Sequence, residues 1–523
     1  MPKLIHQFIN LSSNKDPEKV ALIHKKTELT YQELNDQVSI VSSGLLAQNL
    51  AAGERVAIYL PKRIETVVSF FATSHAGAVF VPVNPLLKPE QVAYILKDCN
   101  VRILITSHDR LSQLQTSLAQ CHDLMMAIDV NNKAENSQDC HFQTKHWADL
   151  QQTKNIRPPS RIDSDIAAIL YTSGSTGNPK GVVLSHSNMI TGAKSVAEYL
   201  ENTPDDNLLA VLPFSFDYGL SQLTTAFHVG ATAVLIDYLL PRDVIKAISK
   251  YSITGLAGVP PLWNQLAQLD WGDAKETLRY ITNSGGAMPV ATLNMLQHSL
   301  PNTKPYLMYG LTEAFRSTYL PPEEIKNRPE SMGKAIPNAE VMVVREDGSL
   351  CGPGEPGELV HRGSLVSLGY WNDPEKTAQH FKPAPIKEKG LPLTEIAVWS
   401  GDKVKMDEEG FLYFIARQDD MIKTSGYRVS PSEVEEVIYA TGLVSETATI
   451  GVPHPTLGQA IIVVATQANN GNAETLLVEC KKQLPNFMHP THIEFIESMP
   501  KNPNGKIDRK KLSAEFSDFY ENI

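Results

Sequence analysis

The chain has 523 residues, 42% of them hydrophobic and 20% charged, a composition that suits a globular protein with more than one lobe. With 47 basic and 58 acidic residues, its formal net charge is -11, which argues against general binding to nucleic acid or to anionic membranes.

The chain shows no sign of export or membrane insertion. Its first residues hold no long apolar stretch before a cleavage site, and no apolar run approaches the length of a membrane span, so we expect neither feature. Five scattered cysteines without a Cys-x-x-Cys pair predict neither a zinc site nor a disulfide framework. We therefore expect a cytoplasmic protein.

Short apolar segments alternate with longer amphipathic ones through the first part of the chain. Residues 31–50 place Leu34, Val38, Val41 and Leu45 at helical spacing, between segments that predict strands. These predicted strands are 56–60, 79–83, 102–106, 166–170, 208–212, 231–236, 255–259 and 280–283. The alternation indicates the α/β class, with mostly parallel sheets covered by helices.

The pattern then changes twice. Short strands among glycine and proline turns predict a small β-rich lobe. Those strands are 340–344, 357–361 and 411–415. Beyond Arg417, a helix that we expect Ser432 to cap and two further strands predict a compact α+β lobe. Those strands are 460–466 and 492–496. We therefore expect one domain at 1–417 and a second at 418–523.

The strongest local signal is a loop rich in glycine and hydroxyl groups. It reads Tyr171-Thr-Ser-Gly-Ser-Thr-Gly-Asn-Pro-Lys-Gly181. Glycines let the backbone approach a phosphate, hydroxyls add donors and Lys180 adds a charge, so the loop suits a polyphosphate. It is not a Walker P-loop, because Pro179 precedes the lysine where that motif has glycine. A surface turn is the alternative, but the density of donors favours phosphate binding.

Residues 172–180 resemble the phosphate loop of the adenylate-forming superfamily, which includes acyl- and aryl-CoA synthetases, adenylation domains and luciferases. Further motifs of this superfamily follow in order along nearly the whole chain. The resemblance implies an enzyme that uses ATP and Mg²⁺ to activate a carboxylic acid as an acyl-adenylate and then passes the acyl group to a thiol. It implies a catalytic role for Lys180. The implied nucleotide contacts in the loop are Thr172, Ser173, Gly174, Ser175, Thr176 and Gly177.

Two motifs resemble the adenine site. Gly285, Gly286 and Ala287 resemble the segment on which the adenine ring lies flat, where a Cβ would block the ring. Tyr309, followed by Gly310, is implied to stack on the same ring.

The same resemblance supplies phosphate, metal and ribose contacts. Thr312 is implied to contact the α-phosphate and Glu313 to hold Mg²⁺, a hard cation that prefers carboxylate oxygens. Asp402 is implied to accept hydrogen bonds from both ribose hydroxyls, with Arg417 as a second ribose contact. One departure is Ala416, which stands where the family usually has glycine before this arginine.

The last motif, residues 501–508, implies that Lys506 is the catalytic lysine of adenylation. The family's C-terminal lobe is implied to rotate between the two half-reactions about a hinge at 418–420, with Asp419 as the pivot. Rotation would remove Lys506 from the site. It would also bring in a loop that lines the pantetheine tunnel, and the implied tunnel residues are Lys423, Gly426 and Tyr427.

Residues 213–220, Pro-Phe-Ser-Phe-Asp-Tyr-Gly-Leu, bear on the acid. Many acyl-CoA synthetases have histidine where this chain has Phe216, whereas the Ser-Phe-Asp pattern resembles amino-acid-activating domains. A buried carboxylate at Asp217 is costly unless a cation meets it, and the α-ammonium of an amino acid would do so. The alternative is that Asp217 only bonds local backbone. With Tyr218 and Ser221, these residues are the predicted acid contacts.

The resemblance extends to a bacterial subgroup of AMP-forming acyl-CoA ligases associated with exosortase A, and to freestanding prolyl-carrier-protein ligases. We favour an amino or imino acid such as proline, loaded onto the phosphopantetheine of a carrier protein acting in trans. The alternative is a short- or medium-chain or aryl acid joined to free CoA. A nucleotide-binding relic without activity is disfavoured, because Lys506 and Glu313 are both retained.

Overall fold

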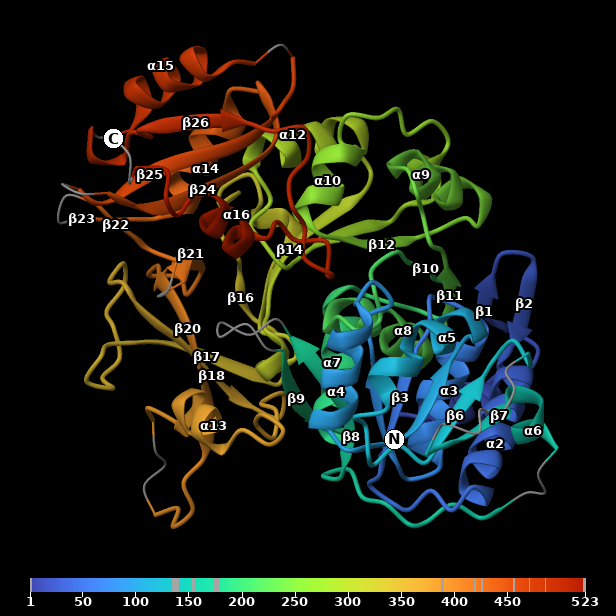
Figure 1. Ribbon diagram of the computed structural model, residues 1–523. Coiled ribbons are helices and arrows are strands. Elements are labelled where there is room, and N and C mark those ends of the chain that lie inside the picture. The colour runs from blue at the N-terminus through green and yellow to red at the C-terminus, as the bar shows by residue number, and fades with distance from the viewer. Residues whose placement is uncertain are drawn as a thin grey trace.

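Four sheets organise the chain in the computed structural model (Figure 1). The structure describes residues 2–133, 141–152, 156–172, 179–386, 390–417, 420–424, 427–454, 457–469, 471–484 and 486–520, and the count of sheets refers to these residues. Two large sheets form the N-terminal part, a third forms a β-rich lobe, and a fourth belongs to the C-terminal lobe.

A seven-stranded sheet, parallel except at one edge, carries the glycine-rich loop. In spatial order its strands are β7 (Gln143–His146), β6 (Met126–Asp129), β5 (Val101–Thr106), β3 (Arg55–Tyr59), β4 (Val79–Pro82), β8 (Ile166–Thr172) and β9 (Lys180–Ser185). Its helices are α2 (Tyr31–Ala47), α3 (Ile64–His75), α4 (Pro89–Asp98), α5 (His108–Leu118) and α6 (Trp147–Gln151). α2 begins at a capping box in which Thr30 and Glu33 exchange side chain-to-backbone hydrogen bonds.

A nine-stranded sheet forms the second layer. In spatial order its strands are β16 (Lys334–Ala335), β15 (Thr318–Leu320), β14 (Lys304–Tyr309), β13 (Tyr280–Asn283), β12 (Gly255–Gly258), β10 (Asn207–Ala210), β11 (Thr232–Leu235), β1 (Val20–His24) and β2 (Thr27–Thr30). The helices of this part are α1 (Gln7–Lys15), α7 (His186–Tyr199), α8 (Asp217–Val229), α9 (Pro241–Lys250), α10 (Pro260–Leu266), α11 (Ala274–Thr277) and α12 (Val290–Ser299). β13 and β14 are parallel neighbours, so the segments that follow them leave the sheet at the same edge.

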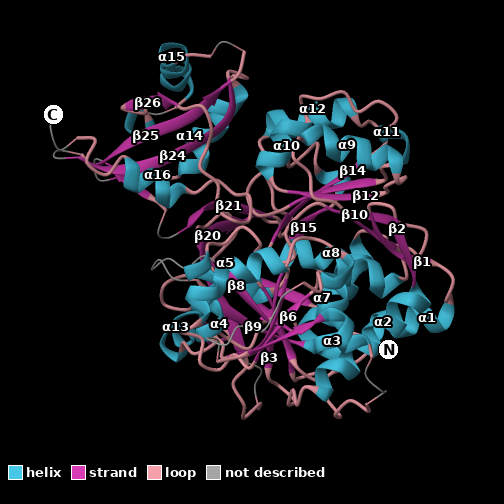
Figure 2. Cartoon of the chain, turned by 45° about the vertical axis from the view of Figure 1, so that its right-hand side comes forward, coloured by secondary structure: helices cyan, strands magenta, loops and turns pink. Residues whose placement is uncertain are grey.

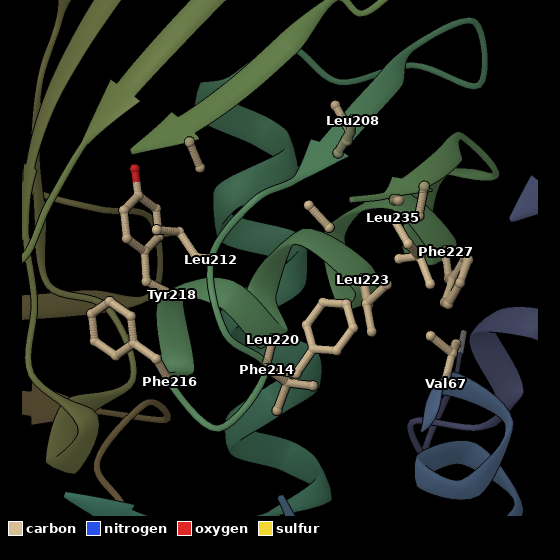
Figure 3. Packing of buried hydrophobic residues seen from close by; sticks show 14 of the residues in the cluster. Val67, Leu208, Leu212, Phe214, Phe216, Tyr218, Leu220, Leu223, Phe227 and Leu235 are labelled. Atoms are coloured by element: carbon tan, nitrogen blue, oxygen red, sulfur yellow. The ribbon is translucent and has the colours of Figure 1, made fainter. Parts of the chain in front are cut away.

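α8 directs side chains to two different places (Figure 3). Phe216, Tyr218 and Phe227 all belong to the main hydrophobic core: Phe227 packs with Phe71, whereas Phe216 and Tyr218 lie at the start of the helix, away from Phe227. Gly219 lets the preceding loop fold onto the helix, because a Cβ at this position would lie 2.1 Å from the carbonyl oxygen of Pro213. The start of α8 is thereby held against its own loop.

The β-rich lobe is a five-stranded antiparallel sheet beside the larger layers (Figures 1 and 2). Its strands are β17 (Ala339–Val344), β18 (Gly357–Gly363), β19 (Phe381–Pro383), β20 (Ile396–Met406) and β21 (Leu412–Arg417), and α13 (Pro374–His380) lies in the same lobe.

Among the described residues, the strands from Ile422 onward form a sheet of their own with three α-helices. The strands are β22 (Ile422–Thr424), β23 (Tyr427–Val429), β24 (Val444–His454), β25 (Gly458–Gln467) and β26 (His492–Phe495), and the helices are α14 (Pro431–Ala440), α15 (Ala473–Gln483) and α16 (Arg509–Glu515). The expected cap at Ser432 is wrong: the helix begins at Pro431, because proline suits the first helical position, and Ser430 precedes it.

The predicted fold class is confirmed: mostly parallel sheets with helices, a small β-rich lobe, and an α+β C-terminal lobe. The domain boundary between 417 and 418 stays a prediction, since 418 and 419 lie outside the described residues. In the part of the chain that the structure describes, no helix combines the length and the apolar character that crossing a membrane requires.

Candidate active site

The β8–β9 hairpin presents the predicted phosphate loop. Thr172 at the end of β8 pairs with Lys180 at the start of β9, so the two predicted contacts stand opposite each other. The five predicted contacts between them lie outside the described residues, namely Ser173, Gly174, Ser175, Thr176 and Gly177.

Residues 367–371 hold Glu313 close to Lys180. The Ser367 backbone N–H donates to the Glu313 carbonyl oxygen at 2.8 Å, and the Tyr370 hydroxyl donates to the Glu313 carboxylate at 2.7 Å. The Lys180 ammonium lies 5.2 Å from the centre of the Tyr370 ring. Tyr370 therefore connects two residues whose motifs lie far apart in the sequence.

A second cation crowds Lys180. Burial, and after it the neighbouring Lys376, lower the pKa of Lys180 to about 8, while Glu313 and Asp373 favour the charged form. Burial and the Glu313 carboxylate raise the pKa of Tyr370, which keeps its hydroxyl protonated as a donor. The two lysine ammonium groups repel each other, and a bound polyanion would relieve this repulsion.

Tyr309 and Asp402 meet at the end of β14. The Tyr309 hydroxyl donates to the Asp402 carboxylate, and the Tyr309 ring lies 6.0 Å from the His361 ring at an angle of 14°. Burial lowers the pKa of His361 to about 3, so this ring is neutral at ordinary pH. Asp402 is also the β-sheet partner of Arg417, whose backbone alone is described. The predicted adenine and ribose residues are thus brought together.

The turn after Tyr309 is tight. At Gly310 a Cβ would lie 3.3 Å from Arg316 Cα, so the returning chain passes close above this glycine. Thr312 begins a short 3₁₀ segment, Thr312–Ala314, and is itself buried. Glu313 follows it at a partly exposed position.

Lys506 reaches this site from the C-terminal lobe. A Cβ on Gly285 would lie 2.7 Å from Lys506 Cε, so the lysine side chain extends directly over this residue, and the φ of +83° at Gly285 favours glycine here. The Lys506 ammonium lies 5.0 Å from the centre of the Phe216 ring. The neighbouring Gly286 and Ala287 are exposed, which leaves this edge open to a flat ligand.

One hydrogen bond clamps the Lys506 loop onto the N-terminal part. The Asn84 side-chain amide donates to the carbonyl oxygen of Pro503 at 2.7 Å. Within the loop, the Lys506 backbone N–H donates to the Asn502 side chain at 3.1 Å. The loop is therefore held internally and from outside while the lysine extends inward.

Asp217 has a partner within the chain. Its carboxylate accepts a hydrogen bond from Arg316 Nη1 at 2.8 Å, and the side chains are only 4% and 3% exposed. The premise that a substrate ammonium must match this buried charge is therefore wrong, because Arg316 matches it. Tyr218 shares a 2.5 Å hydrogen bond with Thr282, and Ser221 is buried one turn further along α8.

Other predicted residues are only partly described. Asp419 and Gly426 lie outside the described residues. Lys423 and Tyr427 are described by backbone alone, in the antiparallel pair β22–β23. Their proposed hinge and tunnel roles stay predictions.

Three site residues escaped the sequence analysis. Arg316 had a signal, since it is the single charged residue between Glu313 and Glu323, close behind a nucleotide motif. Asn84 and Tyr370 had none, because their partners Pro503 and Glu313 are 419 and 57 residues away.

Known proteins match this chain along its length. A family model described as AMP-binding enzyme matches residues 10–371, and one described as AMP-binding enzyme C-terminal domain matches residues 433–506. A long-chain-fatty-acid–CoA ligase of Bacillus subtilis (strain 168) is 28% identical over 547 residues, covering 98% of this chain and 94% of the relative. Surfactin synthase subunit 2 of the same strain is 30% identical over 519 residues, covering 98% of this chain but 14% of that protein.

The fold is also shared with solved structures. One is o-succinylbenzoate coenzyme A synthetase from Bacillus subtilis, in complex with ATP and a magnesium ion. It matches with a TM-score of 0.81 and 25% sequence identity, covering 97% of this chain and 98% of the other.

Proposed function

Because the chain belongs to the AMP-binding enzyme family, we propose that it adenylates a small carboxylic acid with ATP and passes the acyl group to the thiol of coenzyme A. The observation that carries this proposal is the position of Lys506. Its side chain extends along Gly285 to within 5.0 Å of the centre of the Phe216 ring, next to the predicted acid contacts. A cation from one lobe thus enters the site built by another, as adenylation requires.

In the first half-reaction an oxygen of the carboxylate attacks the α-phosphorus of ATP. The bond from this phosphorus to the oxygen bridging to the β-phosphate breaks, and pyrophosphate leaves. Two anions must approach each other, and Lys506 and Lys180 offset their repulsion in a partly buried site. The Thr312 hydroxyl can donate to the α-phosphate from its buried position.

Glu313 fits a magnesium ion. One carboxylate, with the other ligands taken from phosphate and water, is the usual arrangement for this ion. When bound, Mg²⁺ neutralises charge on the departing pyrophosphate. The Tyr370 hydroxyl orients the Glu313 carboxylate toward the side where Lys180 lies. The structurally similar synthetase with bound ATP and magnesium supports this use of both.

The nucleoside fits the remaining groups. We assign adenine to the exposed Gly286–Ala287 edge and to Tyr309, and the ribose hydroxyls to Asp402 and Arg417. The predicted phosphate-loop contacts at 173–177 complete the assignment. Tyr309 already donates to Asp402, so a bound ribose would join an existing hydrogen-bonded pair.

In the second half-reaction the thiol sulfur attacks the acyl carbonyl carbon. The bond from this carbon to the AMP oxygen breaks, and the thiol proton goes to solvent. We propose that residues 418–523 rotate about Asp419 between the two steps, withdrawing Lys506 and bringing in Lys423, Gly426 and Tyr427. Coenzyme A is favoured over a carrier protein, because the fatty-acid–CoA ligase matches over 94% of its own length.

An amino acid on a carrier protein is the second candidate. It is favoured by Asp217, which directly follows Phe216 beside Lys506, and by the similarity to surfactin synthase subunit 2. The Arg316 ion pair removes the electrostatic reason for it, since Asp217 is already matched.

ATP–pyrophosphate exchange dependent on added acid tests the proposal. Lys506→Met should lower exchange by about 100- to 1000-fold, the range for losing one preorganised stabilising group. The same variant should still form thioester from a supplied acyl-adenylate and coenzyme A. The control Lys511→Met, at an exposed lysine of α16, should behave as the parent enzyme. Equal loss in both half-reactions would contradict the assigned role, and no exchange with any acid would sink the proposed function.

A further inference from the structure

Asp217 and Arg316 form a buried ion pair at the acid side of the site. Asp217 opens α8 directly after Phe216, whose ring the Lys506 ammonium approaches. Arg316 lies beyond the nucleotide motif and passes over Gly310. Its guanidinium carbon stands 5.0 Å from the centre of the Tyr218 ring. The pair therefore joins the segment of the predicted acid contacts to the segment that follows the predicted nucleotide motif.

The pair has no net charge, and this limits what can bind beside it. An α-ammonium group would have to compete with Arg316 for Asp217, because the arginine holds that carboxylate at 2.8 Å. A second carboxylate on the substrate would add one uncompensated negative charge in a buried place. Both arrangements are costly where water is excluded. An acid whose distal part is uncharged meets neither penalty.

One donor of the pair is still open. Arg316 Nη2 is fully buried and has no hydrogen-bond acceptor among the described residues. Nη1 is the nitrogen that serves Asp217. A buried N–H without an acceptor is unfavourable, so a ligand that supplies an oxygen here gains over one that does not. A wholly apolar acid offers no acceptor, so Arg316 Nη2 would stay without a hydrogen bond.

We propose that Arg316 determines acid specificity: it occupies Asp217 so that α-ammonium acids are rejected, and its open Nη2 selects an acid carrying a neutral oxygen acceptor, such as a carbonyl or amide. The inference rests on the proposed function and names the substrate class of that site. Asp217 acts as the positioning residue, since it fixes the guanidinium from which the open donor projects.

Five acids of matched length test this through kcat/KM for ATP–pyrophosphate exchange. They are pentanoate, 4-oxopentanoate, glutaramate, glutarate and 2-aminopentanoate. In the parent enzyme the oxo and amide acids should exceed pentanoate by about tenfold, the value of one good hydrogen bond. Pentanoate should exceed 2-aminopentanoate and glutarate by about a hundredfold.

Substitutions should move these ratios in opposite directions. Arg316→Met should raise 2-aminopentanoate relative to pentanoate by about a hundredfold and abolish the advantage of the oxo acid. Asp217→Asn should raise glutarate instead, since the site then carries a positive charge. Arg316→Lys keeps the charge but loses the forked donor, so it should still reject 2-aminopentanoate while losing the oxo preference. The control Arg345→Met removes an arginine from an exposed pair with Glu355 and should change no ratio.

The outcomes separate cleanly. A parent enzyme that prefers 2-aminopentanoate, or ratios that stay the same in both Arg316→Lys and Arg316→Met, would overturn the specificity role while leaving adenylation intact. Thermal unfolding identifies a variant that has lost its fold. If Arg316→Met is unfolded, the ratios measured with Arg316→Lys decide the question. If the parent enzyme shows no exchange with any acid, the proposed function and this inference fall together.

Discussion

The phosphate side and the acid side of the site handle charge in opposite ways. On the phosphate side, comprising Lys180, Lys376, Glu313 and Tyr370, two lysines crowd each other and a carboxylate is partly exposed. On the acid side, Asp217 and Arg316 cancel within the protein and are almost fully buried. Like charges held together at a partly exposed position are available to a ligand of opposite charge, whereas a matched buried pair contributes to the fold and excludes ligands of the wrong charge.

The largest expected effect is on the phosphate side. Glu313→Ala should lower acid-dependent ATP–pyrophosphate exchange by about 100- to 1000-fold, because a magnesium ligand is lost. The free energy of unfolding should change by less than about 1 kcal/mol, since the carboxylate is partly exposed and makes few internal bonds. Exchange kinetics and urea unfolding measure the two. Glu346→Ala, at an exposed position, is the control. A large loss of stability would mean that Glu313 supports the fold instead.

On the acid side, a substitution should mainly lower the stability of the fold. Asp217→Ala leaves the Arg316 guanidinium buried without its partner, so the free energy of unfolding should fall by about 3–5 kcal/mol. Urea unfolding followed by circular dichroism measures the change, with the exposed Asp205→Ala as the matched control. A decrease of less than about 1 kcal/mol in the free energy of unfolding for Asp217→Ala would mean that the buried pair does not stabilise the fold, contrary to this comparison.

The pH dependence sharpens the contrast. Lys180 is charged below its pKa of about 8, so kcat/KM for ATP should fall about tenfold for each pH unit above that value. Lys376→Met removes the neighbouring cation, which should raise the pKa of Lys180 and move the alkaline limb to higher pH. Kinetics between pH 6 and about 10 follow the limb. Superimposable profiles for the parent and Lys376→Met would contradict this, and Lys326→Met, an exposed lysine, should leave the limb in place.

The smallest effect concerns the clamp on the lysine loop. Asn84→Ala removes the 2.7 Å hydrogen bond to Pro503 and a local 2.9 Å hydrogen bond from the Leu86 backbone N–H. The bond to Pro503 is worth about 1 kcal/mol, so exchange should fall about fivefold. Thioester formation from a supplied acyl-adenylate should be unchanged, because Lys506 is not needed there. A parallel loss in both half-reactions would mean that Asn84 acts elsewhere, and the exposed Asn10→Ala should affect neither.

Local patterns sufficed for much of the fold. The helix at Tyr31–Ala47 and strands such as β5 and β13 follow directly from apolar periodicity and from turn residues at their ends. The predicted cap of α14, Ser432, lies two residues beyond the observed one, Ser430, because serine suits a cap at either position and the local pattern does not distinguish them. Patterns of this kind report neighbours within about one turn of helix or one strand.

By itself, the sequence determined the fold class, because strand and helix patterns are local and alternate along the chain, and the reaction class, through motifs that resemble those of the adenylate-forming superfamily in order. Only the tertiary structure decided that Asp217 is matched by Arg316, that Tyr370 serves Glu313, and that Lys506 lies against Gly285. Each of these contacts joins segments separated by many residues. A charged side chain can bind a ligand of opposite charge only if the folded chain has not already placed a neutralising group within about 4 Å of it. A local sequence pattern does not show which distant residues come this close.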